Sequence, residues 1–542
     1  MNEDRRIGVY ICNCGTNIAK VVDAEKVRDR VAELPGVACA RTYKYMCSNP
    51  GQEMITQDIK EHGLDRVVIS ACSPRMHEPT FMKALEAAGL NPFLLEMANI
   101  REQCSWVHDD PAKATAKAAD LTHAAVKRVA RHQPLEKQEA PYHPATLVLG
   151  GGIAGLTVAV ELAEAGQKVH LIEREGVLGG NVGRVDLTAP YLDSARDLLT
   201  EKIILAETSP RIDVHLRSTL TDLQGFVGNF TATVTHRDGT DTTLPVGSVI
   251  VCTGYREFDA TRIERLGFGK HPDVITSFEL EEKLRKGRVE TADGRTPRYV
   301  SIVHCVGSRN PKYHPYCSRV CCMTALKYGH EIKSALPDAM VTDLYVDMLS
   351  FGKGGEDLYR RTSELKTMFL MYEKEDSPQV RVAEEGDDCG LLVQVNERLS
   401  GETIDVPADL VVQLAGMQAR DDSDQVARTV GISLDVEGWF IESHPKLAPV
   451  STATEGVFIA GCCQSPKDIP DSVAQARASA AMVLGYIAQG KVQVDARYAE
   501  VDRDLCSGCR MCNELCPYTA ITYDEEDSRS DVQSALCKAC GT

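Results

Sequence analysis

The chain has 542 residues, of which 43% are hydrophobic and 25% charged, and its formal net charge is −18. A chain of this length can bury several cores, so we expect about two to four domains and no general disorder. The acidic surplus argues against nucleic acid and anionic membranes as partners, because both bind Lys and Arg. No apolar run reaches the roughly 18 residues of a membrane span, and we expect a cytoplasmic protein.

The chain contains twenty cysteines. In a reducing compartment stable disulfides are uncommon, and clustered thiols more often bind metal or carry out redox chemistry. Groups of cysteines in this chain are therefore candidate metal or redox sites.

Residues 1–133 alternate strand-like and helix-like stretches, which predicts a small parallel α/β domain. Ligands bind at strand ends in such sheets. Five cysteines from separate loops, most of them where these strands end, could converge on one metal site: Cys12, Cys14, Cys47, Cys72 and Cys104. No local spacing proves that site, and buried free thiols are the alternative.

Residues 134–145 are polar, contain three prolines and are typical of a linker. The region 146–495 then opens with a strand that runs into Gly150-x-Gly152-x-x-Gly155 and a helix, followed by a second strand that ends at Glu173. This order predicts a dinucleotide whose pyrophosphate lies at the helix N-terminus and whose ribose hydroxyl donates to Glu173.

The flanking segments resemble those of two-dinucleotide-binding flavoproteins and favour FAD over NAD. Such flavoproteins carry Asp after a late Ala-Gly pair, whereas this chain has Cys462-Cys463 there. A polar contact to the ribityl chain is then expected from Asp468 or a backbone amide. Besides the motif residues, the candidate FAD contacts are Ala154, Arg174, Gly179, Gly180, Asn181, Thr253, Gly254, Gly461, Asp468 and Ile469.

Enzymes such as thioredoxin reductase insert a second Rossmann unit for NADPH, and its place in this chain is about 258–380. The strand 298–305 is followed by a single glycine, Gly307. A phosphate cradle needs more backbone freedom than one glycine provides. We expect a degenerate unit that keeps the shape and has lost nicotinamide binding.

Four cysteines stand at that place: Cys305, Cys317, Cys321 and Cys322. Four thiolates match the four iron corners of a [4Fe–4S] cluster. A disulfide between the two neighbouring cysteines would be strained, and buried free thiols are the remaining alternative. His304 is expected to be a strand residue and not a ligand.

The final region, 496–542, contains LCSGCRMCNELCPYTAI, which has the bacterial ferredoxin spacing C-x2-C-x2-C-x3-C-P. Its cysteines are Cys506, Cys509, Cys512 and Cys516. A second run begins at Cys537 and Cys540 and stops before its third cysteine. We expect that the gene product is longer, or that a partner completes the site; half a ferredoxin fold cannot cover its own core, which favours the first explanation.

The segments YMCSNPGQE, ISACSPRMHEPTF, HCVGSRN and YCSRVCCMTALKYGH resemble the A subunit of heterodisulfide reductase and its bacterial relatives, over nearly the whole chain. This resemblance implies an α/β protein with a three-layer, Rossmann-type FAD domain like that of thioredoxin reductase. It also implies a small N-terminal α/β domain that binds a cluster and a C-terminal ferredoxin-like α+β domain. Lys327 is implied to approach the N5 edge of the flavin.

The resemblance further implies an oxidoreductase that acts within a complex and splits electron pairs between clusters, by electron bifurcation to ferredoxin and a disulfide. The implied partners are ferredoxin, B and C subunits, and a hydrogenase, formate dehydrogenase or other donor subunit, in a homodimer of heteromeric units. Some members carry an inserted ferredoxin domain, which is absent here because no cysteine lies between Gly183 and Val249. The alternatives are a scaffold with structural clusters, a self-contained pyridine-nucleotide disulfide reductase, and a confurcating or plain relay subunit.

Overall fold

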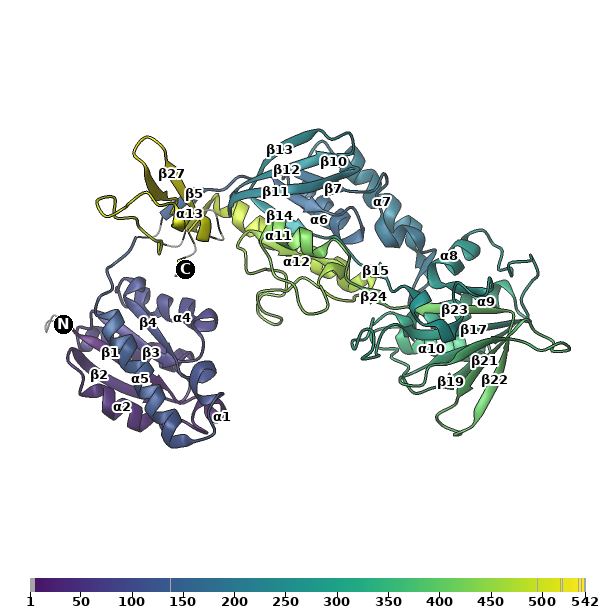
Figure 1. The fold of residues 1–542 in the computed structure, drawn as a ribbon, viewed down its shortest axis with the longest axis horizontal. Helices are drawn as coiled ribbons and strands as arrows, with labels where there is room; N and C mark the ends of the chain where they lie inside the picture. The colour runs from purple at the N-terminus through teal and green to yellow at the C-terminus, as the bar shows by residue number, and fades with distance from the viewer. Residues whose placement is uncertain are drawn as a thin grey trace. The chain divides into compact units, whose positions relative to one another are not determined.

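The computed structural model describes residues 5–136, 138–494, 496–516, 518, 520–534, 536–537 and 539–540. The chain divides into two compact units, one formed by Met1–Gln138 with Asp495–Thr542 and the other by Glu139–Val494. Each unit is built around its own parallel β-sheet or sheets, several of whose strands are labelled in Figure 1.

The N-terminal part of the first unit is a four-stranded parallel sheet in the order β2-β1-β3-β4. Every residue of the central strands β1 and β3 is buried, as expected where helices cover both faces. Asp110 caps the longest helix of this part, α5, by accepting from the Ala112 amide at 2.9 Å. The strands are β1 (Ile7–Cys12), β2 (Val37–Tyr43), β3 (Arg66–Ala71) and β4 (Leu95–Asn99), and the helices are α1 (Gly15–Ile18), α2 (Ala24–Ala32), α3 (Asn49–Glu61), α4 (Pro74–Ala87) and α5 (Pro111–Val129).

The C-terminal part of the first unit contains the short helix α13 (Met511–Leu515) and an antiparallel pair, β27 (Ile521–Asp524) and β28 (Arg529–Val532). Five residues of the two cysteine segments lie outside the described residues: Pro517, Thr519, Lys538, Gly541 and Thr542. Residue 495, where the preceding region is expected to end, also lies outside them.

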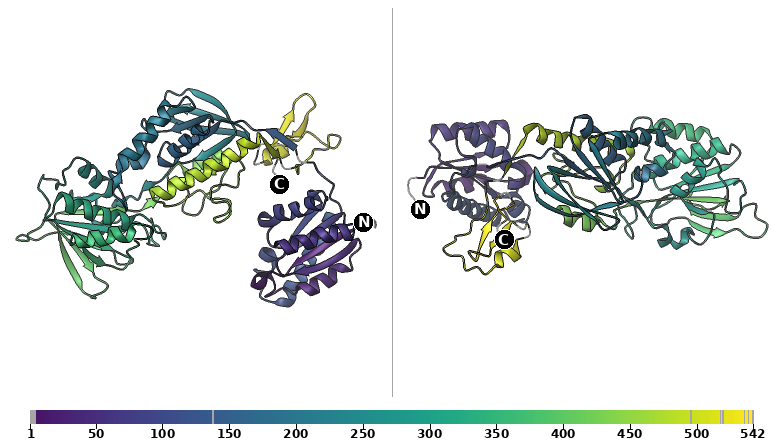
Figure 2. Two further views of the ribbon diagram at one scale, coloured as in Figure 1. Left: turned by 180° about the vertical axis from the view of Figure 1, so that it is seen from behind. Right: turned by 90° about the horizontal axis from the view of Figure 1, so that it is seen from above.

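The second unit begins with a five-stranded parallel sheet in the order β10-β7-β6-β14-β25. Alternate strand residues face opposite layers: Val148 packs towards helices α6, α7 and α12, whereas Leu147 and Leu149 pack towards an antiparallel sheet. Figure 2 shows the long yellow-green helix α12 from behind. The elements are β6 (Thr146–Leu149), β7 (Val169–Glu173), β10 (Ile212–Leu216), β14 (Ser248–Val251), β25 (Val457–Ile459), α6 (Ile153–Glu164), α7 (Ala195–Thr208), α11 (Ser423–Val430), α12 (Ile469–Gln489), and the antiparallel strands β11 (Ser218–Phe226), β12 (Asn229–His236) and β13 (Asp241–Val246).

A second five-stranded parallel sheet follows in the same unit, in the order β16-β23-β17-β18-β19. Two short crossing strands connect it to the first sheet, β15 (Arg256–Glu257) and β24 (Met417–Gln418). The elements of this part are β16 (Val274–Thr276), β17 (Tyr299–Val306), β18 (Met340–Tyr345), β19 (Met368–Met371), β23 (Leu410–Ala415), α8 (Ser277–Arg285), α9 (Cys321–Ala335), α10 (Gly355–Glu364), and the antiparallel strands β20 (Gln379–Val382), β21 (Leu391–Asn396) and β22 (Thr403–Ala408). The predicted α/β class is confirmed. Among the helices in the described ranges, none combines the length and apolar character needed to cross a membrane.

Candidate functional site

The glycine motif after β6 forms a tight turn into α6. A Cβ atom on Gly155 would lie 1.8 Å from the Gly150 carbonyl oxygen, and one on Gly150 would lie 2.4 Å from the Cys252 oxygen. A Cβ atom on Gly152 would instead meet nothing nearer than the Gly180 Cα at 4.0 Å. Gly150 and Gly155 are therefore needed for packing, whereas Gly152 leaves open space at the N-terminus of α6, where a phosphate binds.

This open space belongs to a cavity of about 1370 Å³ within the second unit. The volume exceeds the roughly 300–1,000 Å³ of most small-ligand pockets and is suited to a whole dinucleotide. The predicted FAD contacts that line it are Gly150, Gly152, Ala154, Glu173, Arg174, Gly180, Asn181, Thr253, Gly254, Gly461, Asp468 and Ile469. Two predicted contacts, Gly155 and Gly179, do not line the cavity. The Gly179 amide donates to the Gly151 carbonyl at 2.8 Å.

Glu173 ends β7 and lines the cavity. Its carboxylate accepts from the backbone amides of Gly151 at 2.7 Å and Glu175 at 2.8 Å. A carboxylate has about four acceptor positions, so it retains capacity for a ribose hydroxyl. These backbone contacts fix the carboxylate at the edge of the glycine turn.

The cysteine pair that replaces the expected Asp does not face the cavity as a pair. Cys462 lines the cavity, and its thiol donates to the Lys467 carbonyl at 3.3 Å, whereas Cys463 is buried and its thiol donates to the Val251 carbonyl at 3.2 Å. Asp468 lines the cavity and caps α12, where it accepts from the Asp471 amide at 2.8 Å. The N-terminus of this 21-residue helix supplies partial positive charge to the cavity wall.

The second parallel sheet has no phosphate cradle after β17. A Cβ atom on Gly307 would lie 2.2 Å from the ring of Phe258, so this glycine allows close packing of an aromatic ring. The next helix, α9, begins only at Cys321. The turn thus lacks the short glycine loop and helix N-terminus that hold a dinucleotide phosphate.

The predicted thiols of this region lie at the end of β17 and the start of α9. Cys321 lines the large cavity, and Cys305 lines a neighbouring cavity of about 180 Å³. The Cys305 thiol donates to Cys321, and this hydrogen bond lowers the pKa of Cys321, as the charge of His304 also does, against the opposing effect of burial. The Cys317 sulfur accepts from the Arg319 amide at 3.3 Å. Donation to Cys321 and burial raise the pKa of Cys305, and the negative charges of Cys321, Cys322 and Cys317 add to that rise.

Lys327 lines the cavity and is 3% exposed. Its ammonium group pairs with Glu281, donates to the Leu187 carbonyl at 3.0 Å and lies 3.6 Å from the Glu331 carboxylate. Burial raises the pKa of Glu331 to about 7. The predicted lysine is therefore a buried, fixed cation at the cavity wall.

Sequence reasoning missed the acidic residues around Lys327. Glu281 is 1% exposed and accepts from the Tyr328 hydroxyl at 2.8 Å, and Glu257 lines the same cavity with its pKa raised to about 7 by burial. Glu281 follows Phe278 by three positions on α8, on the buried face of that helix. The sequence signal that could have revealed Glu281 is a carboxylate on the helix face where the pattern predicts apolar residues.

The N-terminal thiols separate into a group of four and one outlier. Cys14, Cys47 and Cys72 each add to burial in raising the pKa of Cys12 to about 12, while the Met46 amide donates to Cys12 and opposes that rise. The Cys104 thiol instead donates to the Ala114 carbonyl at 3.1 Å. Burial raises the pKa of Cys72, and the positive charge of Arg101 partly opposes that rise.

The ferredoxin-spaced cysteines are surrounded by backbone amides. Donation from the Ser530 and Gly508 amides lowers the pKa of Cys506, and donation from Met511 lowers that of Cys509. The Cys516 sulfur accepts from Ala520 at 3.3 Å, the Cys512 thiol lies 3.4 Å from the Ser530 hydroxyl, and the Cys537 sulfur accepts from Ala499 at 3.3 Å. Cys540 is exposed. Amide donors that stabilise thiolates are what an iron–sulfur cluster requires.

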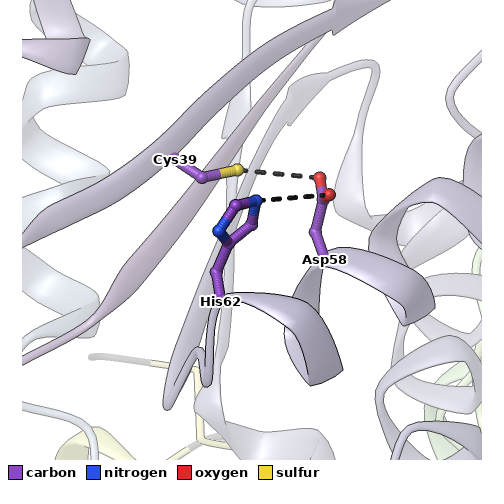
Figure 3. Close-up of side chains that lie close together, drawn as sticks. All are labelled: Cys39, Asp58 and His62. Atoms are coloured by element: carbon purple, nitrogen blue, oxygen red, sulfur yellow. Dashed lines mark hydrogen bonds and ion pairs between the residues drawn. The ribbon is translucent and has the colours of Figure 1, made fainter.

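One further group of metal-ligand types lies apart from the predicted sites. Cys39, Asp58 and His62 have ligand atoms within 4.8 Å of one another (Figure 3). Arg41 donates to both oxygens of Asp58, at 2.6 and 2.7 Å, and Tyr10 donates to the same carboxylate at 3.2 Å. This carboxylate already has a cationic partner, so the group is an ion-pair network and not a metal site.

Comparison with known proteins agrees with both parts of this geometry. Residues 148–194 match the family described as NAD(P)-binding Rossmann-like domain, and residues 499–522 match the 4Fe-4S binding domain. Among solved structures, thioredoxin reductase of Lactococcus lactis is 18% identical, with 64% of this chain and 99% of that chain covered and a TM-score of 0.43.

Full-length relatives are more similar. The second iron-sulfur A subunit of the CoB–CoM heterodisulfide reductase of Methanopyrus kandleri is 37% identical over 610 positions, which cover 97% of this chain and 92% of the relative. The A subunit of the H2:CoB-CoM heterodisulfide,ferredoxin reductase of Methanothermobacter thermautotrophicus is also 37% identical, with 98% and 92% covered. A protein of Archaeoglobus profundus described as like the heterodisulfide reductase A subunit is 35% identical, with 96% and 91% covered.

The dinucleotide cradle and the ferredoxin-spaced thiols define an oxidoreductase of the iron–sulfur flavoprotein class, with a Rossmann-type α/β fold and with FAD and [4Fe–4S] clusters as cofactors. The chain belongs to the family of heterodisulfide reductase A subunits. The resemblance found in the sequence is thus confirmed. The 610 aligned positions exceed the 542 residues of this chain, so the Methanopyrus relative has internal segments that this chain lacks.

Proposed function

We propose that the chain takes electrons in pairs and delivers them singly, one to ferredoxin and one to a disulfide acceptor such as the CoB–CoM heterodisulfide named for its relatives. Two such turnovers supply the two electrons that, with two protons, convert one disulfide into two thiols. When bound, FAD can accept an electron pair and release the two electrons one at a time, and each [4Fe–4S] cluster exchanges one electron.

The observation that carries this proposal is the position of Cys321. The same cavity is lined by Gly152 of the dinucleotide turn and by Cys321 of the four-thiol group. A cluster held by Cys305, Cys317, Cys321 and Cys322 would therefore adjoin the dinucleotide without an intervening nicotinamide site.

The residues of this chain have separable roles in the proposal. The glycine turn and Glu173 hold the dinucleotide, and the amide end of α12 beside Asp468 offers positive charge. Lys327 supplies a fixed cation at the cavity wall, where it would favour negative charge on a reduced ring. The ferredoxin segment would hold a cluster, which would exchange single electrons, through the thiolates of Cys506, Cys509, Cys512, Cys516, Cys537 and Cys540.

The proposed partners follow from the names of the relatives, which mention ferredoxin, formate, hydrogen and F420H2. We propose B and C subunits with a hydrogenase, formate dehydrogenase or other donor subunit, in a homodimer of such units in the cytoplasm. The complex should be purified anaerobically and supplied with donor, ferredoxin and disulfide. Ferredoxin reduction must depend on the disulfide, and ferredoxin reduction without it would overturn bifurcation.

A non-bifurcating or confurcating relay is the second candidate. It is supported by the internal segments that the Methanopyrus relative has and this chain lacks, because the inserted ferredoxin domain of some family members would be one route for electrons. In that case disulfide reduction should proceed at full rate without ferredoxin. The same assay therefore separates the two functions.

The isolated chain should not be reduced by NADH or NADPH, because Phe258 fills the space that a phosphate turn would need beside Gly307. Anaerobic mixing with either nucleotide should leave the flavin absorbance unchanged over seconds to minutes, while dithionite bleaches it. Rapid bleaching by either nucleotide would identify a self-contained pyridine-nucleotide reductase instead.

We predict that Cys12, Cys14, Cys47 and Cys72 hold the N-terminal cluster and that Cys104 does not. Cys72→Ser should remove about four irons per chain, because a hydroxyl is a poor ligand for this cluster. Cys104→Ser, the matched control from the same set of strand ends, should retain them, since its thiol bonds to the Ala114 carbonyl. Iron analysis of the two variants decides the ligand set, and iron loss in Cys104→Ser would contradict it.

A further inference from the structure

A partly buried carboxylate lies at the junction between the two parallel sheets of the second unit. Glu257 is on the crossing strand β15, and the side-chain amide of Gln418 on β24 donates to its backbone carbonyl at 3.2 Å. Its side chain is 20% exposed and lines the large cavity, in the same wall as Thr253 and Gly254. The junction of the sheets thus places a carboxyl group in the wall of the dinucleotide cavity.

The carboxylate of Glu257 is held loosely by its neighbours in the described part of the chain. Its Oε1 accepts from the Ser277 hydroxyl at 3.2 Å. Its Oε2 lies 3.8 Å from a guanidinium nitrogen of Arg184, which is beyond hydrogen-bond distance. The guanidinium of Arg184 is stacked on the Phe278 ring, 3.6 Å from the ring centre. Both oxygens of Glu257 therefore keep free acceptor positions.

The other carboxylates that line the cavity have closer partners. Arginine side chains lie between 2.6 and 3.4 Å from four of them, Glu175, Asp421, Asp422 and Asp471. Backbone amides donate to Glu173 and to Asp468. Lys327 pairs with Glu281. Among the carboxylates that the structure describes in this wall, Glu257 is the one without a cation or an amide at such a distance.

The charges that face Glu257 come from several elements. Burial has the largest effect and raises its pKa to about 7, while Arg184 lowers it and Glu279 at the start of α8 raises it further. Tyr255 on the preceding segment and Tyr328 on α9 also interact with this carboxylate, and burial raises the pKa of both hydroxyls, so both stay neutral near pH 7. Glu257 is therefore able to gain and to lose a proton near neutral pH.

The proposed electron path requires a proton acceptor. An electron pair that enters a flavin ring is accompanied by a proton, whereas an iron–sulfur cluster takes up an electron alone. When two electrons leave singly through clusters, the proton does not travel with them. A carboxylate of the cavity wall with a free acceptor position is suited to receive it.

We propose that Glu257 accepts this proton when the electrons leave the cavity, passes it to water, and returns a proton when the next electron pair enters. The inference rests on the proposed function, because it assumes that electrons enter in pairs and leave singly. In the outward step an N–H bond of the reduced ring breaks, an O–H bond forms at Glu257 Oε2, and two electrons pass to clusters. The carboxylic acid then ionises to water beside Arg184, whose side chain is 52% exposed.

The test measures how fast the flavin of the loaded chain loses its electrons. The chain is reduced anaerobically and mixed with ferricenium, which takes up one electron and no proton, while flavin absorbance is followed by stopped flow. The wild-type rate should rise with pH around 7, because only the ionised carboxylate accepts a proton. Glu257→Gln should be slower by about 100-fold above pH 7, with a rate independent of pH. Glu257→Asp should recover the pH dependence and part of the rate.

Time-resolved infrared spectra provide a second readout in the wild-type chain itself. During oxidation a carboxylic acid C=O band should appear and decay, it should shift in D2O, and it should be missing from Glu257→Gln. If no such band forms in the wild type, Glu257 does not receive the proton and the proposal is wrong.

Asp421→Asn is the matched control for the change of charge. Asp421 lines the same cavity, but its side chain is 74% exposed and pairs with Arg256 at 2.8 Å. This variant should keep the wild-type rate and pH profile. Equal slowing in Asp421→Asn would show a general effect of removing negative charge from the cavity and would overturn the proposal.

Flavin content and the thermal unfolding midpoint of each variant separate a structural role from a role in proton transfer. Loss of flavin from both Glu257 variants would show that the carboxylate maintains the cavity, which contradicts the inference. If ferredoxin reduction by the complex depends on the disulfide while Glu257→Gln reacts at the wild-type rate, only this inference fails. If ferredoxin reduction is independent of the disulfide while Glu257 behaves as expected, bifurcation fails and the proton acceptor stands.

Discussion

Replacement of Gly152 by tryptophan is expected to give a folded chain that is purified without FAD. A Cβ atom at this position meets nothing within 4.0 Å, so the backbone tolerates the change, but the indole occupies the space in which a pyrophosphate approaches the helix N-terminus. Flavin content should fall from about one per chain to nearly none, as measured by absorbance after denaturation.

Gly485→Trp is the matched control. Gly485 lies on α12, its Cβ position is also open, and it does not line the cavity. This variant should keep its flavin and its thermal unfolding midpoint. A full complement of FAD in the Gly152 variant would place the cofactor elsewhere.

Serine at Cys321 is expected to remove one complete cluster, about four irons per chain, while FAD and the ferredoxin segment remain. A serine hydroxyl is a harder ligand than a thiol and ionises less readily, so it cannot close the fourth iron corner. Iron analysis and the paramagnetic spectrum of the reduced chain should both show the loss.

Cys389→Ser serves as the reference for this experiment, because Cys389 lies outside all proposed ligand sets and is partly exposed. It should retain all iron. If Cys321→Ser keeps its irons and its spectrum, the cysteines of β17 and α9 are packing residues and the electron path proposed through them is wrong.

Local sequence patterns were sufficient to predict the strand–glycine–helix unit at 146–175. The alternation of strand and helix signals and the glycine spacing are determined within a few residues, and the structure places β6, α6 and β7 accordingly. The position of Cys321 in the wall of the dinucleotide cavity depends instead on how two distant sheets pack, and no local spacing contains that information.

The same limit applies to individual side chains. The sequence left open which of five N-terminal cysteines belong together, because Cys104 differs from the others only by a contact with Ala114 on the following helix. Glu281 was missed because its partner, Lys327, stands 46 residues away in the chain. Pairings across such separations become visible only once the strands and helices are in place.

Burial of the Lys327–Glu281 pair limits which substitutions these two positions tolerate in homologues. Removal of one partner leaves the other charge buried without a counter-charge, which destabilises the fold by about 3–5 kcal/mol. Simultaneous replacement of both residues by apolar residues is often neutral for stability. A homologue that had lost redox function would therefore be free to exchange the two together and still fold. A newly sequenced homologue that retains both residues is then expected to have a functional flavin site. A homologue in which leucine or methionine replaces both is expected to fold but to have lost redox function.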